Sequence, residues 1–380
     1  MSHLPFPDTE VREFEYFIGP QHVGITGNFG VHLKAVGDEI VEARANPGYL
    51  HRGFEKLMEQ RRWIQNIPMV CRICVPDPDV NEVAYSLAVE EIAGLDVPLR
   101  AQYLRTMVLE MSRLQAYLLY FGGVAGALGL YTIPQWTVGD RDYLLDRFEE
   151  LTGGRVYHIY TTIGGVRRDL PEGFSQRLRD TLHYLSQRLK EYDRLMFDNA
   201  VFKRRTQGVA VIKREYALQM GVTGPNLRAT GVPADVRRDD PYLVYPGLDF
   251  EVPTLEEGDI YARVMVRRLE FEQSIHILHQ VLDWLDHHPP EPVLNKEVIR
   301  NPFDWAPPPG DAFVRVESSK GEYGYYVVSD GGIKPYRVHV RGPSMTHGIL
   351  VLEDLLKGAR IADVAPFMFS LDVCPPDIDR

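Results

Sequence analysis

Two short segments, 300 positions apart in the chain, offer the same pair of side chains for chemistry. Cys74 and Asp77 stand in the sequence Cys-Val-Pro-Asp, and Cys374 and Asp377 stand in Cys-Pro-Pro-Asp. Each segment presents a soft thiol and a hard carboxylate three residues apart. If the two segments face each other, they form a pocket of two thiols and two carboxylates, a donor set that can hold Zn²⁺.

A simpler interpretation suits either motif alone. A cysteine is often a small buried hydrophobic residue, and an aspartate near a proline is often a helix cap. The repetition of the motif argues for a shared role. A disulfide of Cys74 with Cys374 or Cys71 stays open, although three cysteines in 380 residues indicate a reducing compartment rather than a disulfide framework.

Candidate proton carriers lie nearer the N-terminus. His22 precedes the first strand-like segment, and Arg52 and Glu55 stand together within 51–56. Histidine and glutamate carry protons near neutral pH when their pKa values are tuned, and arginine supplies a fixed charge. The residues alone favour a capped, solvated helix start for the segment 51–56.

Two glycine-rich segments are the remaining candidates. His158 is followed by Gly164-Gly165, a pair that favours a turn or a close approach of two backbones over phosphate binding. The segment 223–231 is rich in glycine and proline, and we interpret it as a docking or site loop.

The composition limits the class of protein. A hydrophobic fraction of 44% and a charged fraction of 25% are typical of a globular chain, which excludes disordered and fibrous classes. The 42 basic and 53 acidic residues give a net charge of −11, which argues against nucleic-acid binding. The N-terminus does not resemble a signal peptide, and the uncharged stretch 115–139 is too rich in glycine for a membrane span. We interpret that stretch as a buried helix end followed by a loop, in a soluble chain that can still dock to a membrane complex.

Apolar periodicity predicts the elements that must position these residues. Alternation predicts strands over 30–36, 39–45, 313–317, 323–329 and 336–340. Spacing of three and four predicts helices over 51–67, 80–95, 98–121, 140–152, 173–197, 259–287 and 344–356. Asp79 is expected to cap the second of these helices. Ordered loops and connectors are expected over 209–253 and 289–309, and a tail over 372–380.

These elements predict an α+β chain that is mostly α, with a central helical bundle and a small antiparallel β unit from N- and C-terminal segments. The expected division is an N-terminal β unit (1–48), a helical core (49–310), a β segment pairing with the N-terminal unit (311–343), and a C-terminal helix with the Cys-x-x-Asp tail (344–380). All four form one compact assembly. Pairing of the β segments would bring the two cysteine motifs together.

Several segments together resemble one superfamily. They are 19–22, 50–56, 81–90, 164–166 and 328–332. Over almost its whole length the chain resembles the 49-kDa subunit of respiratory complex I and the large subunit of membrane-bound nickel–iron hydrogenases. The resemblance implies the fold of those subunits. It also implies packing on a small subunit that carries a proximal 4Fe-4S cluster, with the active-site cavity at their interface.

The resemblance also bears on metal binding. In the hydrogenases, two Cys-x-x-Cys motifs hold nickel and iron. The matching positions here are Cys74, Asp77, Cys374 and Asp377. With half of the thiols replaced, the resemblance implies no nickel–iron centre and no cofactor bound by this chain alone.

The complex I branch differs at two other positions. There, a histidine and a tyrosine bind the quinone head, and the matching residues here are Thr26 and Val75. The strongest resemblance is to the large subunit of ferredoxin-dependent, membrane-bound sulfane-sulfur reductases, which has two Cys-x-x-Asp motifs in similar segments.

That branch implies a function, partners and a location. The chain would be the large subunit of an ion-pumping complex on the cytoplasmic face of the cell membrane. Reduced ferredoxin would supply electrons for the reduction of polysulfides in the cavity. The implied partners are the small cluster subunit, 30-kDa-like and ferredoxin-like cluster subunits, and antiporter-like membrane subunits. The alternatives are a quinone-reducing relative of complex I and a non-catalytic scaffold.

The resemblance further implies residue roles. Cys74 and Cys374 would act on the sulfur substrate, and Asp77 and Asp377 would carry protons. Proton transfer or tuning of the proximal cluster is implied for His22, Arg52, Glu55, Arg72 and His158.

Overall fold

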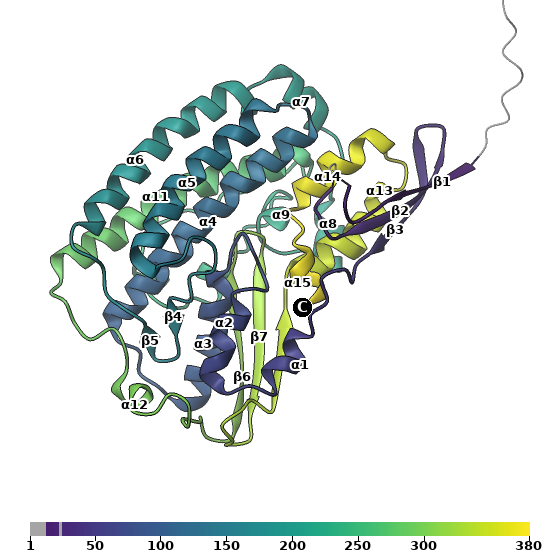
Figure 1. Ribbon diagram of the computed structural model, residues 1–380. Helices are drawn as coiled ribbons and strands as arrows, with labels where there is room; N and C mark the ends of the chain where they lie inside the picture. Colours follow the sequence, from purple (N-terminus) through teal and green to yellow (C-terminus); the bar gives the residue numbers. More distant parts are fainter. Residues whose placement is uncertain (1–12, 23–24) are drawn as a thin grey trace, which may run out of the picture.

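The computed structural model describes residues 13–22 and 25–380, and long helices form its centre (Figure 1). The longest are α4 (Leu99–Ala127), α5 (Thr132–Thr152), α6 (Phe174–Tyr192) and α11 (Ile260–His287). As predicted, leucines at helical spacing form the buried face of α6, namely Leu178, Leu182, Leu185 and Leu189. The predicted mostly helical α+β class is confirmed.

Helix α4 is buried on nearly all sides, so its charged residues need partners inside the protein. Arg105 donates to Glu90 of α3 (Asp79–Ala93) at 2.9 Å. Arg113 donates to the backbone carbonyls of residues 317–318 at 2.7 and 2.8 Å. A buried charge without a partner costs several kcal/mol. These bonds therefore restrict where α3 and the loop after residue 317 can sit against α4.

The glycine run in α4 serves close packing and does not end the helix. A Cβ at Gly122 would lie 2.5 Å from Thr137 Oγ1, and one at Gly123 would lie 2.8 Å from Phe369 Cδ1. Glycine thus lets α5 and α14 (Val364–Leu371) pack directly on the α4 backbone. Helices α4 and α5 both extend into the stretch that was predicted to be a loop. In the described part of the chain no helix is long and apolar enough to cross a membrane.

Two antiparallel three-stranded sheets accompany the bundle. The first contains β1 (Glu13–Ile18), β2 (Gly30–Val36) and β3 (Glu39–Asn46), and the second contains β6 (Gly310–Glu317), β7 (Glu322–Ser329) and β8 (Arg337–Arg341). Within residues 13–22 and 25–380 the sheets share no strand, so the predicted pairing of 311–343 with the N-terminal unit is wrong. The first sheet projects from the body (Figure 1).

The free edge of β3 is instead met by a C-terminal loop. Ile40 N–H donates to the Ala359 carbonyl at 2.9 Å, and Gly358 N–H donates to the Ile40 carbonyl at 2.7 Å. Helix α3 packs on the strands of the second sheet. The C-terminal loop thus pairs with the first sheet and α3 packs on the second. The two β segments therefore do not need to pair with each other.

Two predicted helices are interrupted. The segment 51–67 forms α1 (Phe54–Met58), a 3₁₀ turn (Trp63–Asn66) and the start of α2 (Ile67–Val70). The chain bends before Trp63, whose ring is buried and whose indole N–H donates to the Gly332 carbonyl at 2.9 Å. The segment 344–356 is divided into a π-helical turn (Thr346–Val351) and α13 (Leu352–Leu356).

Short elements complete the described chain, some of them within the predicted loops 209–253 and 289–309. They are β4 (Thr161–Thr162), β5 (Gly165–Val166), a π turn (Asp193–Phe197), α7 (Ala200–Thr206), α8 (Arg214–Met220), α9 (Gly224–Arg228), α10 (Val236–Asp239), α12 (Lys296–Ile299), 3₁₀ turns at Tyr245–Gly247 and Ile361–Asp363, and α15 (Pro375–Asp379). The predicted close backbone approach at Gly165 is confirmed, because a Cβ there would lie 2.1 Å from the Val293 carbonyl oxygen.

A substitution at Gly224 tests whether the segment 223–231 packs closely against the β6–β7 loop. The φ of Gly224 is +65° and its missing Cβ would lie 2.2 Å from Gly321 Cα, in the β6–β7 loop. We expect Gly224→Ala to lower the free energy of unfolding by about 2 kcal/mol or more, because it adds backbone strain and a backbone clash. Thermal unfolding of the purified protein measures this change.

Gly139→Ala is the matched control. Gly139 is exposed within α5 and no atom lies within 4 Å of a Cβ built there. Alanine should stabilise that helix by up to about 1 kcal/mol. Equal melting temperatures for the two variants would contradict the proposed role of the Gly224–Gly321 contact.

Candidate functional site

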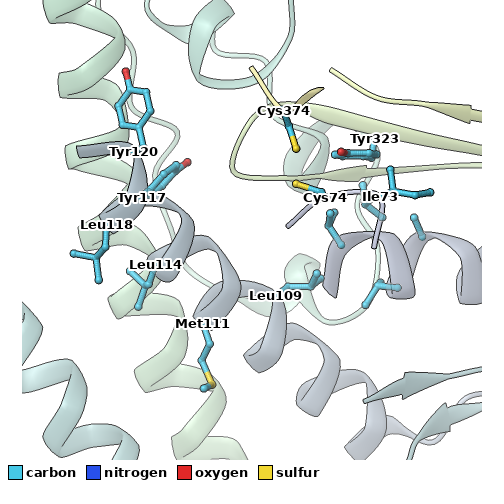
Figure 2. Packing of buried hydrophobic residues seen from close by; sticks show 14 of the residues in the cluster. Ile73, Cys74, Leu109, Met111, Leu114, Tyr117, Leu118, Tyr120, Tyr323 and Cys374 are labelled. Carbon is cyan, nitrogen blue, oxygen red and sulfur yellow. The ribbon is translucent and has the colours of Figure 1, made fainter. Parts of the chain in front are cut away.

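The two cysteine motifs meet, although the β pairing that was expected to bring them together is not found among the described strands. Cys74 lies between α2 and α3, and Cys374 immediately precedes α15. Figure 2 shows the two sulfur atoms turned toward each other, and both thiols are free. Burial first, and then the neighbouring Cys374, raise the pKa of the Cys74 thiol, while the Lys320 ammonium acts in the opposite direction.

The two aspartates hold backbone amides. Asp77 Oδ2 accepts the Ser319 N–H at 2.8 Å, and Asp377 Oδ2 accepts the Ser344 N–H at 2.9 Å. Burial raises the pKa of both carboxyls, against the bonds from these serines. A Cβ on Gly342 would overlap Asp377, with 1.2 Å to Oδ1, so glycine is required beside it.

This donor set does not fit a nickel–iron centre. Two thiols stand where four would be needed, and each carboxylate already accepts a backbone hydrogen bond. Over the described ranges, no group of three or more His, Cys, Asp or Glu side chains is arranged to hold a metal ion. What the arrangement offers is two thiols in contact, which can form and break sulfur–sulfur bonds.

A cavity of about 350 Å³ opens on one side of the pair. Cys374 lines it and is 5% exposed, whereas Cys74 is fully buried and does not line it. Thr26 and Val75, the positions of the quinone contacts in the complex I branch, also line this cavity. The rest of the lining is mainly apolar and comprises Gly27, Asn28, Leu50, Pro76, Ala116, Leu119, Tyr120, Lys320, Phe369, Asp372, Val373, Pro375 and Pro376.

A second group of predicted residues surrounds His158. Its Nδ1 lies 2.8 Å from Asp79 Oδ2, and its ring stacks on Phe148 with centroids 3.7 Å apart. The prediction that Asp79 caps α3 is wrong. Pro78 occupies the cap position, and the Asp79 carboxylate is bound to the histidine. Nε2 of His158 is buried and has no hydrogen-bond partner among the described residues.

Two arginines adjoin this group. Arg52 Nη2 donates to the Arg72 carbonyl at 2.8 Å, and the Arg72 guanidinium lies 4.8 Å from the Tyr157 ring centroid. Burial lowers the pKa of Arg52, while Tyr157, Cys374 and Asp379 act in the opposite direction. Cys71 does not line the cavity; its thiol donates to the Pro68 carbonyl at 3.3 Å, and Arg72 Nη1 is 3.4 Å from its sulfur.

Glu55 and His22 have different surroundings. Glu55 accepts hydrogen bonds from Arg380 at 3.0 Å and Arg337 at 3.1 Å, so it anchors the end of the chain and β8. His22 is exposed in the loop that follows β1. Thr26, which also precedes β2, lines the cavity.

Four residues at the site were not predicted from the sequence. Ser319 and Ser344 bind the aspartates, Lys320 lines the cavity with Cys374, and the Tyr323 hydroxyl is turned toward the thiols (Figure 2). Three of the four belong to the hairpin β6–β7. The only signal in the sequence is the Ser-Ser-Lys-Gly turn between two predicted strands, which does not show where the hairpin points.

The chain is similar to known proteins over nearly its whole length. The family model described as "Respiratory-chain NADH dehydrogenase, 49 Kd subunit" matches residues 127–380. One subunit of the NADH-quinone oxidoreductase of Thermosipho melanesiensis is 49% identical, with 97% of this chain and 100% of the relative covered. One subunit of the F(420)H(2) dehydrogenase of Methanosarcina mazei is 40% identical, with 98% and 99% covered.

A solved structure is similar as well. A chain in the structure of the membrane-bound sulfane sulfur reductase, an archaeal respiratory membrane complex, is 53% identical and superimposes with a TM-score of 0.94. The similarity covers 99% of this chain and 100% of that one. The resemblance stated from the sequence is thus confirmed, and this chain belongs to the family of the 49-kDa subunit of respiratory-chain NADH dehydrogenase.

Proposed function

We propose that this chain is the large subunit of a ferredoxin-dependent, ion-pumping membrane complex that reduces sulfane sulfur. The observation that carries the proposal is the contact between Cys74 and Cys374 at the wall of a mainly apolar cavity. The 53% identical chain of a sulfane sulfur reductase supports it. Thiols in contact can cleave a sulfur–sulfur bond and store two electrons as a disulfide.

The exposure of the two thiols suggests an order of events. Cys374, which lines the cavity, attacks the substrate as the thiolate. A bond forms from its sulfur to one sulfane sulfur, and the departing sulfur leaves with the electron pair. Cys74 then attacks Cys374, releases the second product and leaves a Cys74–Cys374 disulfide. Two electrons from the partner subunit and two protons restore the thiols.

The remaining predicted residues fit supporting roles. Asp77 and Asp377 have raised pKa values because they are buried, which suits carboxyls that pass protons to thiolates. Arg52, Arg72 and His158 form a group in which His158 Nε2 is left for a partner. We assign this group to the proximal 4Fe-4S cluster of the small subunit, whose potential a cation or hydrogen-bond donor tunes.

His22 and Glu55 remain candidates for proton transfer. Glu55 lies in a network of arginines near the chain end, and such a network can hold a proton path or simply fix the tail. The proposed partners are the small cluster subunit, 30-kDa-like and ferredoxin-like cluster subunits, and antiporter-like membrane subunits. This chain would lie in the peripheral arm of the complex, on the cytoplasmic face of the membrane. The similar structure is that of a respiratory membrane complex, which supports the membrane assembly.

Quinone reduction is the second candidate. It is favoured by the similarity to a subunit of an NADH-quinone oxidoreductase. Against it, the two positions that contact the quinone head in the complex I branch are Thr26 and Val75, and the valine side chain offers no hydrogen bond. A scaffold without catalysis is the third candidate, and it requires no role for the thiols.

Removal of either thiol tests the proposal. In the purified complex, Cys74→Ala and Cys374→Ala should each lower polysulfide-dependent oxidation of reduced ferredoxin by on the order of 100-fold or more, because each removes one sulfur of the disulfide. Cys71→Ala is the control and should keep most of the activity, since Cys71 does not line the cavity and its thiol bonds to the Pro68 carbonyl.

Other outcomes separate the candidates. Unchanged activity in both variants would exclude a catalytic role for the pair. Quinone reduction by a complex that lacks polysulfide activity would establish the second candidate. Stoichiometric nickel in the purified chain would contradict our interpretation of the two Cys-x-x-Asp motifs.

The order of attack is tested by trapping. In Cys74→Ala, treatment with an organic trisulfide should leave a stable mixed disulfide on Cys374, because the resolving thiol is absent. In Cys374→Ala, Cys74 should stay unmodified because the cavity does not reach it. Peptide mass spectrometry of the complex detects the adduct, and an adduct on Cys74 alone would reverse the assignment.

A further inference from the structure

Lys320 is a buried cation at the cavity wall. It lies in the four-residue loop between β6 and β7 and is 2% exposed. It lines the same cavity as Cys374 and Asp372. The Asp77 carboxylate fixes this loop because it accepts a hydrogen bond from the Ser319 N–H. The ammonium is therefore placed by the fold and not by a flexible surface side chain.

The Lys320 ammonium has N–H groups available for a further hydrogen bond. A lysine ammonium carries three N–H groups, and the hydrogen bond of Lys320 Nζ found in the described part of the chain goes to Asp372. Asp372 is also 4.0 Å from Arg267 Nε, which itself has no hydrogen bond there. Two buried cations thus share one carboxylate, and this end of the cavity can accept another negative charge.

Cys374 lines the same cavity and is a candidate for that charge. Burial alone would lower the pKa of Lys320, but Asp372 and then Cys74 and Cys374 raise it above its ordinary value. The influence is mutual, since Lys320 opposes the rise of the Cys74 pKa. Lys320 and Cys374 line the same cavity, so the charge of the ammonium favours a thiolate there.

Tyr323 supplies a second donor from the same hairpin. Its side chain is fully buried and its hydroxyl has no hydrogen-bond partner among the described residues. Figure 2 shows this hydroxyl turned toward the Cys74–Cys374 pair. A buried hydroxyl without a hydrogen-bond partner is unfavourable. A thiolate that forms beside it would accept the missing hydrogen bond.

We propose that Lys320, assisted by Tyr323, stabilises the thiolate of the Cys74–Cys374 pair, and that Asp372 competes with that thiolate for the ammonium. The proposal rests on the proposed function, in which cleavage of the sulfane bond moves an electron pair onto the departing sulfur. Lys320 and Tyr323 donate hydrogen bonds to sulfur anions and give up no proton. Such fixed donors favour charge that develops during the reaction.

Site-specific alkylation tests this without any turnover of substrate. The assembled complex is treated with iodoacetamide at neutral pH, and modification of Cys374 is followed by peptide mass spectrometry. Lys320→Met should slow modification about tenfold or more, because the cation is lost. Asp372→Asn should speed it about threefold or more, because the ammonium is released to the sulfur.

Two further variants complete the design. Lys320→Arg keeps the charge and should restore most of the rate lost in Lys320→Met. Tyr323→Phe removes one hydrogen bond and should slow the reaction a few-fold. If Lys320 had only a structural role, Lys320→Met and Asp372→Asn would change the alkylation rate of Cys374 in the same direction. That result, or an unchanged rate in Lys320→Met, overturns the proposal.

The result is separable from the proposed function. If both cysteine variants keep full polysulfide reduction while alkylation follows the expected order, the cation still stabilises the thiolate and the sulfane reductase assignment alone fails. If the cysteine variants lose activity and alkylation does not depend on Lys320, the assignment stands and the role of Lys320 fails.

Discussion

The site depends on three carboxylates that accept backbone N–H groups around the two thiols. Asp379 accepts the N–H groups of Gly48 and Leu50, both at 2.8 Å, and so binds the C-terminus to the segment after β3. Asp77 and Asp377 bind amides in the loops that frame the thiols. Carboxylates that accept backbone N–H groups fix loop geometry strongly, since these are charge-assisted bonds. The contact between Cys74 and Cys374 follows from these bonds.

Buried charged residues are costly to bury, but here they orient the loops around the site. The core around α4 holds Arg105, Arg113 and Arg228, all buried and all bonded to carboxylates or carbonyls. Replacement of such pairs by apolar residues is often neutral for stability, so stability alone does not explain them. What they provide here is orientation, because the arginine–carbonyl bonds of residues 317–318 aim the loop that carries Lys320 at the thiols.

Prediction from the sequence succeeded for features set by neighbouring residues and failed for features set by contacts between residues far apart in the chain. The period of leucines in α6 and the alternation in β2 predicted those elements correctly. The two Cys-x-x-Asp motifs were expected to meet through a β pairing, and they meet without it. The break before Trp63 escaped prediction because it depends on a hydrogen bond to Gly332, far along the chain. The use of the aspartates as amide acceptors escaped for the same reason, since nothing near Asp77 in the sequence indicates Ser319.

Arg52 links the two groups of site residues, the His158 group and the Cys74–Cys374 pair, through electrostatic interactions. Its guanidinium is influenced by Tyr157 of the His158 group on one side and by Cys374 and Asp379 on the other. It also holds the Arg72 carbonyl, two residues before Cys74. Arg52 therefore interacts both with the His158 group and with the thiol pair. A permanent positive charge at that position favours the negative charge that reduction of a disulfide creates, so the same residue can serve both the donor and the acceptor.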